Sequence, residues 1–311
     1  MLSKVAERVY WTGRYLERVE STARLLSIYD MLLFDLPRSV KLSWYNLITI
    51  NSLQKDFHER YSVQDERNVV KFMLGDETNP SSVTSSINAV RENIRTTRDL
   101  LPEETWESVN ELSIFVQANL ADGIKRSNRH EFLQDLIKGC QQIIGLLFGN
   151  MPHDPAWQFL RLGRKLERAD MTTRNLDAGI AAILEIGKDE SAVNSRQIIW
   201  GNVLRSLNAD QSYRRSTRSE VSGVDVVYYL LQDPYLPRAL GYCLDSMGDA
   251  AGKLPRGKGV QKHLLDMRKV LDDGMSNLAL DMSFRDYLNQ MQIQLAQLHN
   301  EIGATWFPQV R

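Results

Sequence analysis

Apolar residues in the first part of the chain recur at alternating spacings of three and four positions. The series consists of Val5, Val9, Thr12, Leu16, Val19, Ala23 and Leu26. These spacings place every member on one face of an α-helix. We therefore predict a helix from about Ser3 to Phe34, roughly 45 Å long at 1.5 Å per residue. A helix of that length must span the molecule.

The same helical spacing dominates the rest of the chain. A second stripe consists of Phe159, Leu162, Leu166, Ala169, Thr173 and Leu176. We expect an all-α protein, an elongated multi-helix bundle. The valines and tyrosines of Val224–Tyr229 could suggest a strand, but the related segment Asn68–Leu74 favours a helix. The other predicted helices are Trp44–Phe57, Asn68–Leu74, Ser82–Leu100, Glu103–Ser127, Glu131–Phe148, Ser191–Asn208, Val224–Leu231, Arg238–Ala251, Val260–Leu280 and Ser283–Thr305.

A twelve-residue segment occurs twice in the sequence. The first copy, Gly13–Arg24, returns as the second copy, Gly163–Arg174, with seven identical positions and one exchange of Glu for Asp. A second pair of segments, Val69–Asp76 and Val226–Asp233, aligns without a gap and pairs Asp76 with Asp233. Such self-similarity indicates an internal duplication. We predict two pseudo-symmetric helical repeats, 1–150 and 151–311, packed together as one globular unit.

Charged residues fill the two copies, and two interpretations of them remain open. In the first, the two helices face each other and their Glu–Arg pairs form a structural network, since breaking a buried pair costs ~3–5 kcal/mol. In the second, the arginines line a pocket that binds a carboxylate or phosphate. The candidate residues are Arg14, Glu17, Arg18, Glu20 and Arg24 in the first copy and Arg164, Glu167, Arg168, Asp170 and Arg174 in the second.

Each copy also begins with a glycine inside a predicted helix. A glycine there costs ~1 kcal/mol relative to alanine. The presence of Gly13 and Gly163 at matching positions therefore needs a compensating reason. We expect that another helix packs closely against the backbone at both glycines.

Composition and charge narrow the possible functions. The net charge of −1 provides no global basic field, which argues against a nucleic-acid or anionic-membrane binder. Cys140 and Cys243 lie in no CxxC motif, so we expect reduced thiols and a cytoplasmic protein. No apolar run approaches the about 18 residues of a membrane span. The five histidines are scattered without ligand spacing, and no glycine-rich phosphate loop is present, so we expect neither a metal nor a cofactor.

The doubled motif resembles that of the bacterial Alpha-E family of helical proteins, named for a Glu-Arg motif. The resemblance rests on both copies, on the opening Ala6–Trp11, and on the segments Asn79–Ser82 and Asp233–Arg238. It implies the pairs Glu17-Arg18 and Glu167-Arg168 as the motif. Asp76, Asp233 and Arg238 are further candidate binding residues, although Ser81 stands where Arg238 stands in the second half.

The resemblance also implies a biological context. Members of the family are typically encoded beside circularly permuted ATP-grasp ligases and transglutaminase-like peptidases. This context suggests an accessory or binding component of a peptide- or amide-forming system, with a peptide or small carboxylate as a possible ligand. A homo-oligomer is also possible.

The alternative is an enzyme that acts on a peptide amide or carboxylate. Glu17 or Glu167 would then be the general acid–base and the arginines would stabilise the anion. An enzyme predicts that one of these glutamates opens into a pocket with a raised pKa. A structural network predicts sealed and mutually satisfied pairs.

Overall fold

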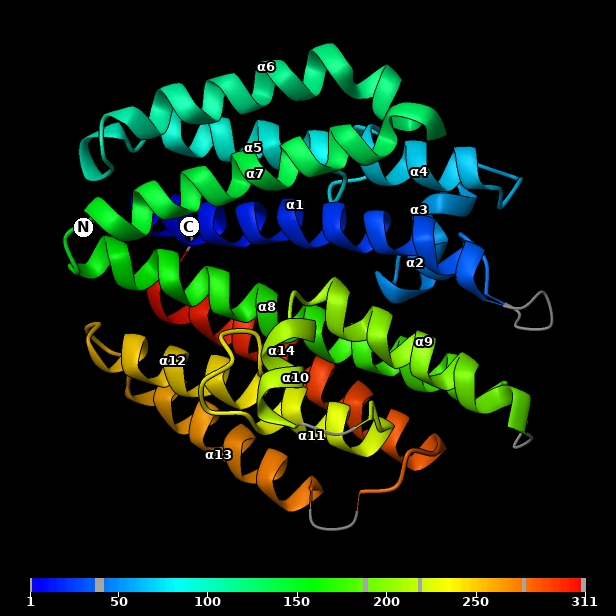
Figure 1. Ribbon diagram of the computed structural model, residues 1–311. Helices are drawn as coiled ribbons and strands as arrows, with labels where there is room; N and C mark the ends of the chain where they lie inside the picture. The colour runs from blue at the N-terminus through cyan, green and yellow to red at the C-terminus, as the bar shows by residue number, and fades with distance from the viewer. Residues whose placement is uncertain (1, 37–41, 187–189, 218–219, 276–277, 309–311) are drawn as a thin grey trace.

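The computed structural model describes residues 2–36, 42–186, 190–217, 220–275 and 278–308. Within these ranges, the regular elements are fourteen α-helices and one short 3-10 helix, and no strand is present. The expectation of an all-α protein is confirmed. Figure 1 shows the long helices stacked in layers, with both chain ends at the same side.

Helix α1 (Ser3–Asp35) is the central helix of the first half of the chain. It packs against α5 (Val83–Arg95) and α7 (Arg126–Asn150), and α6 (Glu104–Ile124) covers both of these helices. The shorter elements of this half are α2 (Asn46–Ile50), α3 (Gln54–His58), α4 (Glu66–Leu74) and the 3-10 turn η1 (Arg98–Leu100).

Helix α8 (Pro155–Leu184) has the corresponding position in the second half. It packs against α12 (Leu240–Gly252) and α14 (Met282–Trp306), and α13 (Lys258–Gly274) packs on both. Helix α9 (Glu190–Ser206) contacts α1 and α8. The remaining elements are α10 (Asp210–Ser216) and α11 (Gly223–Gln232).

The predicted boundary between the repeats falls on a tight turn between α7 and α8. Helix α7 ends at Asn150, and the side chain of Asp154 accepts the backbone N–H of Trp157 to cap α8. Pro155 occupies the first helical position, where its missing N–H costs nothing. The division into two repeats stays an interpretation of the sequence.

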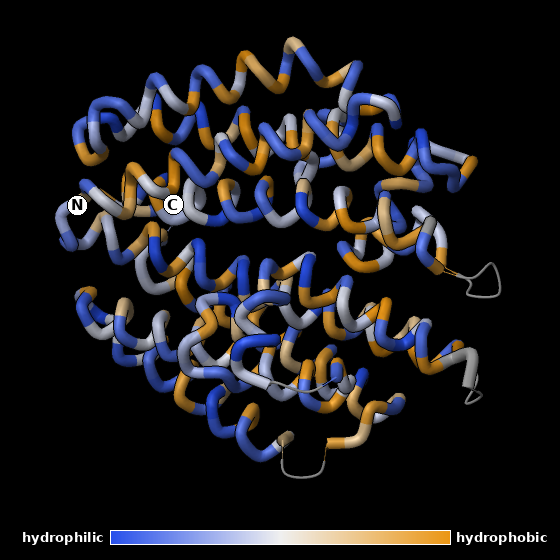
Figure 2. Tube along the Cα trace, in the orientation of Figure 1, coloured by the Kyte–Doolittle hydropathy of each residue, from blue (hydrophilic) through white to orange (hydrophobic). Residues whose placement is uncertain are grey.

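The hydrophobic core extends through both halves, because α1 and α8 are buried between the other helices. The stripe of α1 is sealed: Val9, Leu16 and Leu26 are each at most 1% exposed. Leu162 and Leu166 on α8 are equally buried. Figure 2 shows apolar and polar residues alternating along the outer helices, as expected for helices that bury one face.

Most long helices begin and end close to the predicted residues, but several predictions need correction. The helix predicted over Ser82–Leu100 ends at Arg95 and is followed by η1, and the helix predicted over Val260–Leu280 ends at Gly274. The single helix predicted over Trp44–Phe57 is wrong, because the chain breaks between α2 and α3, where Ser52 adopts a φ of 57°. Helix α10 was not predicted. Only Lys125 separates α6 from α7, so α7 begins five residues before the predicted Glu131. The segment around Val224–Tyr229 is a helix, as expected.

Candidate functional site

The two copies of the repeated segment meet face to face where α1 crosses α8. A methyl group on Gly13 would overlap the carbonyl oxygen of Leu160, and one on Gly163 would overlap the carbonyl oxygen of Tyr10. Each helix backbone therefore occupies the space that a side chain of the other would need. The expectation of close helix packing at both glycines is confirmed.

Glutamates of each copy bind arginines of the other copy. Glu17 on α1 accepts a hydrogen bond from Arg164 Nε at 2.9 Å. Glu167 on α8 accepts from Arg14 Nε at 2.7 Å and from Arg18 Nε at 2.6 Å. Arg168 Nε lies 2.8 Å from Glu17 Oε2. The crossing is thus held by reciprocal ion pairs, each made between α1 and α8.

Glu17 has a third arginine partner, so the two glutamates of the crossing have unequal numbers of partners. Arg238, which precedes α12, donates from Nη1 to Glu17 at 2.6 Å and from Nη2 to Glu20 at 3.2 Å. Glu20 also pairs with Arg24 at 2.9 Å. Glu17 therefore faces three guanidinium groups, whereas Glu167 faces two. The sequence signal for this difference is Ser81, which occupies the position equivalent to Arg238.

The last pair of the second copy has a different neighbourhood. Arg174 donates to Asp170 at 2.8 Å and also to the carbonyl of Ile50 at 3.2 Å and the hydroxyl of Ser52 at 2.8 Å. These bonds tie α8 to the break between α2 and α3. We call the whole set the arginine–glutamate network: Arg14, Glu17, Arg18, Glu20, Arg24, Arg164, Glu167, Arg168, Asp170, Arg174 and Arg238.

Asp76 and Asp233 make no hydrogen bond to this network in the described part of the chain. Asp76 accepts from Thr78 and from the Tyr61 hydroxyl. Asp233 accepts the backbone N–H groups of Tyr235 and Leu236. Aspartate commonly stabilises a turn in this way. Apart from the bond between Tyr61 and Asp76, the bonds of both residues stabilise turns.

The central glutamates are sealed from solvent and remain ionised. The side chain of Glu17 is 0% exposed and that of Glu167 is 3% exposed. Burial alone would raise the pKa of Glu17, but Arg168, Arg238 and Arg164 hold it well below its usual range. Burial likewise opposes the effect of Arg18 and Arg14 on Glu167, whose pKa falls to about 2. A carboxylate with such a low pKa is a poor general acid–base near neutral pH.

Acid sensitivity follows from the lowered pKa of Glu167. A glutamate carboxyl in the unfolded chain has a pKa of 4.5, whereas that of Glu167 is about 2 in the fold. The stabilisation is therefore complete above the unfolded value and is lost as the pH falls from about 4.5 towards about 2. We expect the free energy of unfolding to drop over this window, as measured by urea titration at each pH. Glu167→Gln should flatten the drop, and an unchanged slope in that variant would contradict the assignment.

Five surface cavities of the described chain lie elsewhere. The most spacious, about 710 Å³, is lined by residues of α4, α6 and α7, with Arg129 among them. None of the five is lined by Glu17 or Glu167. Within the described residues, no three His, Cys, Asp or Glu side chains are grouped to hold a metal ion. No helix in the same ranges is long and apolar enough to cross a membrane.

Lys165 lies beside the arginine–glutamate network but is not among the binding residues predicted from the sequence, where it only forms part of a basic stripe with Arg164 and Arg168. Its Nζ donates to the carbonyl of Pro237 at 3.3 Å and lies 4.3 Å from the ring centre of Tyr242. It occupies the position equivalent to Tyr15 in the first copy. That exchange of tyrosine for lysine, together with the basic stripe, is the signal that favours it as a binding residue.

The fold and the crossing define an all-helical protein built around paired Glu-Arg motifs. The Alpha-E family, described as a predicted alpha-helical domain with a conserved ER motif, matches residues 1–307, and the chain belongs to this family. An uncharacterized protein of Mycobacterium bovis is 23% identical over 280 residues, which cover 82% of this chain and 30% of that protein. An uncharacterized protein of Mycobacterium tuberculosis is 22% identical over the same shares. No solved structure matches the chain.

Proposed function

We propose that the protein is a non-catalytic helical component of a peptide- or amide-forming system. The observation that carries the proposal is the closure of the arginine–glutamate network. Glu17 and Glu167 are buried, paired with two or three arginines each, and held at a low pKa. Groups arranged in this way hold helices together. The motif thus supports a rigid scaffold.

The proposed partners are a circularly permuted ATP-grasp ligase and a transglutaminase-like protein. They are taken from the family resemblance. The relatives add support of a different kind: this chain spans about 30% of the length of the mycobacterial proteins it matches. In those proteins the matched region is therefore one part of a longer chain. A scaffold that works beside other domains suits such an arrangement.

The alternative is an enzyme in which Glu17 or Glu167 transfers protons and the arginines stabilise an anion. The low pKa of both carboxyls and the absence of either from the cavities described above count against it. Assembly of several copies of the chain is compatible with either role. Neither alternative has a specific observation in its favour.

Co-expression with the proposed partners tests the function. We expect the tagged chain to co-purify with the ligase, and we expect the ligase to form more amide product, measured by mass spectrometry, when the chain is present. The chain alone should form none. Amide product formed by the chain alone would contradict the proposal. A ligase that neither binds the chain nor changes its product yield when the chain is present would also contradict it.

Two variants separate the accessory role from the enzyme. Glu167→Gln and Glu17→Gln are compared with wild type at a temperature where circular dichroism shows that all three are folded. For an accessory protein, product yield should follow the amount of complex. Loss of product in a folded variant that still binds the ligase would instead identify a catalytic glutamate.

A further inference from the structure

Cations outnumber carboxylates in the arginine–glutamate network. Its ion pairs use seven arginines but only four carboxylates, and Lys165 lies beside them as an eighth cation. The whole chain, by contrast, has a net charge of −1. The arginine side chains of the network are at most 20% exposed, so water screens them only in part. Surplus positive charge in such a place is costly unless an anion lies nearby.

The surplus is largest on the Glu17 side. Glu17 and Glu20 together face four arginines, namely Arg24, Arg164, Arg168 and Arg238, and Lys165 adds a further positive charge. On the other side, Glu167 is matched by Arg14 and Arg18 alone. Burial, with a smaller contribution from the neighbouring arginines, lowers the pKa of Lys165 from 10.5 to about 8. An anion bound here would relieve part of that cost.

Three side chains on this side retain hydrogen-bond donors. Arg164 uses Nε for Glu17, and among the described residues its two Nη groups make no hydrogen bond. Arg168 pairs with Glu17 through Nε at 2.8 Å, and its two Nη groups make no hydrogen bond in the described part of the chain. Lys165 donates to a single backbone carbonyl. Positions 164, 165 and 168 share one face of α8, because residues three and four apart are neighbours on a helix.

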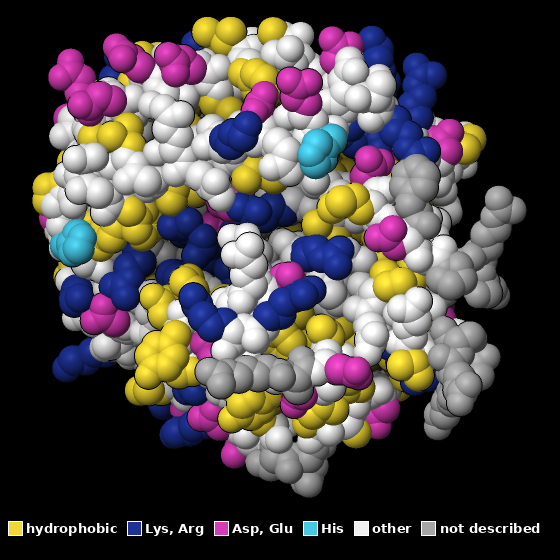
Figure 3. Space-filling view, in the orientation of Figure 1, with side chains coloured by type: hydrophobic (Ala, Val, Ile, Leu, Met, Phe, Trp, Pro, Cys, Tyr) yellow, Lys and Arg dark blue, Asp and Glu magenta, His cyan; other side chains and the backbone are white. Residues whose placement is uncertain are grey.

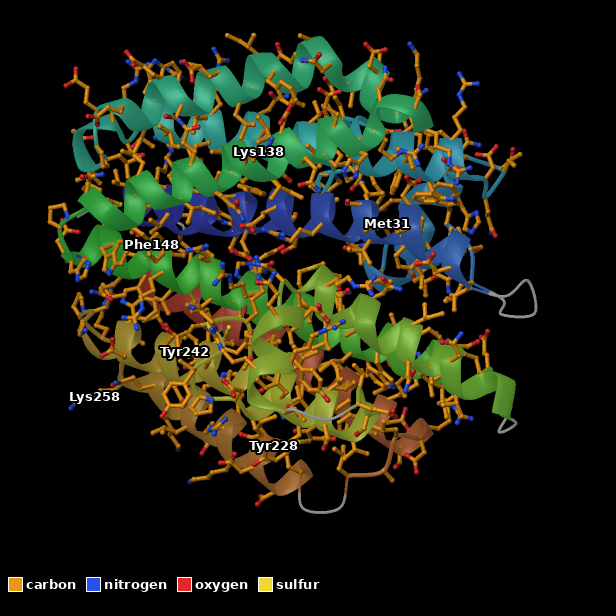
Figure 4. All side chains as sticks on the ribbon, in the orientation of Figure 1. Met31, Lys138, Phe148, Tyr228, Tyr242 and Lys258 are labelled. Atoms are coloured by element: carbon orange, nitrogen blue, oxygen red, sulfur yellow. The ribbon has the colours of Figure 1, made fainter. Side chains whose placement is uncertain are left out.

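Aromatic rings border these donors on two sides. The guanidinium carbon of Arg164 lies 4.7 Å from the ring centre of Phe148 on α7, and Lys165 lies against Tyr242 on α12. Figure 4 labels both aromatic residues on the face turned to the viewer. Figure 3 shows lysine and arginine side chains gathered between their positions, around a depression at the middle of that face. The rings hold the cations in place and limit the approach of water.

We propose that Arg164, Lys165 and Arg168 form a binding site for an oxyanion, a carboxylate or phosphate group of a ligand that enters between α7 and α12. Two guanidinium forks and an ammonium group match the donors that such groups prefer. The first copy cannot form an equivalent site, because Tyr15 replaces the lysine and Arg18 already donates twice to Glu167. The site does not depend on the proposed ligase or peptidase partners.

Binding of two simple probes tests this site. Inorganic phosphate and N-acetylglycine, which represents a peptide carboxylate, are titrated into the wild-type chain by calorimetry at neutral pH. The melting temperature is measured in parallel against sodium chloride of equal ionic strength, because a ligand specific for the folded state raises it. Saturable binding of phosphate alone indicates a phosphate-bearing ligand, and binding of N-acetylglycine alone indicates a carboxylate. Binding of neither would overturn the proposal.

A matched pair of variants locates the site. Lys165→Gln removes one donor and its charge, and should weaken binding roughly tenfold or more, the loss expected for one charge-assisted hydrogen bond. Lys138→Gln removes the same charge from an exposed position on α7, where Lys138 pairs with Asp135, and should leave binding unchanged. Equal affinity in wild type and Lys165→Gln would refute the assignment. If Lys165→Gln does not fold, the wild-type melting series with the two probes decides whether the site binds an oxyanion.

Discussion

Gly163→Ala is expected to destabilise the protein strongly, although alanine is the better helix former. The new methyl group would overlap the carbonyl oxygen of Tyr10 and press on Arg14. Because the obstacle is backbone, the two helices must move apart, and the reciprocal ion pairs of the crossing would lengthen with them. We expect a loss of at least about 3 kcal/mol, the upper end of ordinary overpacking penalties. In a chain of this size that corresponds to a fall in melting temperature of roughly 5 °C or more.

Gly145→Ala is the matched control. Gly145 lies in the interior of α7, exposed, with no atom within 4 Å of the position of an added methyl group. This substitution should stabilise the protein by up to ~1 kcal/mol, the usual difference between the two residues in a helix. The two changes should therefore shift the melting temperature in opposite directions. A neutral or stabilising Gly163→Ala would show that the helices are not in contact there.

The second large effect is expected for Glu17→Gln. The change preserves shape but removes the negative charge that Arg164, Arg168 and Arg238 share. Three guanidinium groups would remain close together at a fully buried position. Breaking a buried ion pair from one side costs ~3–5 kcal/mol, and here the partners also repel each other. Urea unfolding should show this loss at neutral pH.

Two comparisons make the result specific. Glu167→Gln should cost less, because only Arg14 and Arg18 lose a partner and Arg18 is 18% exposed. Glu92→Gln breaks an exposed pair with Arg95, in which both side chains are more than half exposed, and should leave the melting curve at its wild-type position. If Glu17→Gln also melted like wild type, the network would contribute nothing to the fold.

Much of this arrangement was predictable because its signals are local. The stripe from Val5 to Leu26 predicted the long helix α1, and the second stripe, Phe159 to Leu176, indicated a helix within the range of α8. The doubled glycine indicated a close helix contact, and the doubled Glu-Arg pair indicated partners across it. Each of these inferences needs only neighbouring positions on one helix face.

Other features depend on contacts between distant segments, which helical spacing does not encode. Arg238 reaches Glu17 from 221 positions further along the chain. The break between α2 and α3 is fixed by hydrogen bonds from Arg174, so the apolar spacing of that region predicted one continuous helix instead. The surplus of cations became visible only when the partners of Glu17 and Glu20 were known.

The separation between partners also has a consequence for biosynthesis. Glu17 leaves the ribosome early, but its partners follow 147 to 221 residues later. At ~5–20 residues per second, the newly made α1 waits on the order of ten seconds or more before Arg238 exists. Throughout that interval Glu17 lacks one or more of these partners, so its carboxylate must stay hydrated or be left without them. A nascent chain that stops short of residue 238 lacks one of the three arginines that pair with Glu17 in the complete fold.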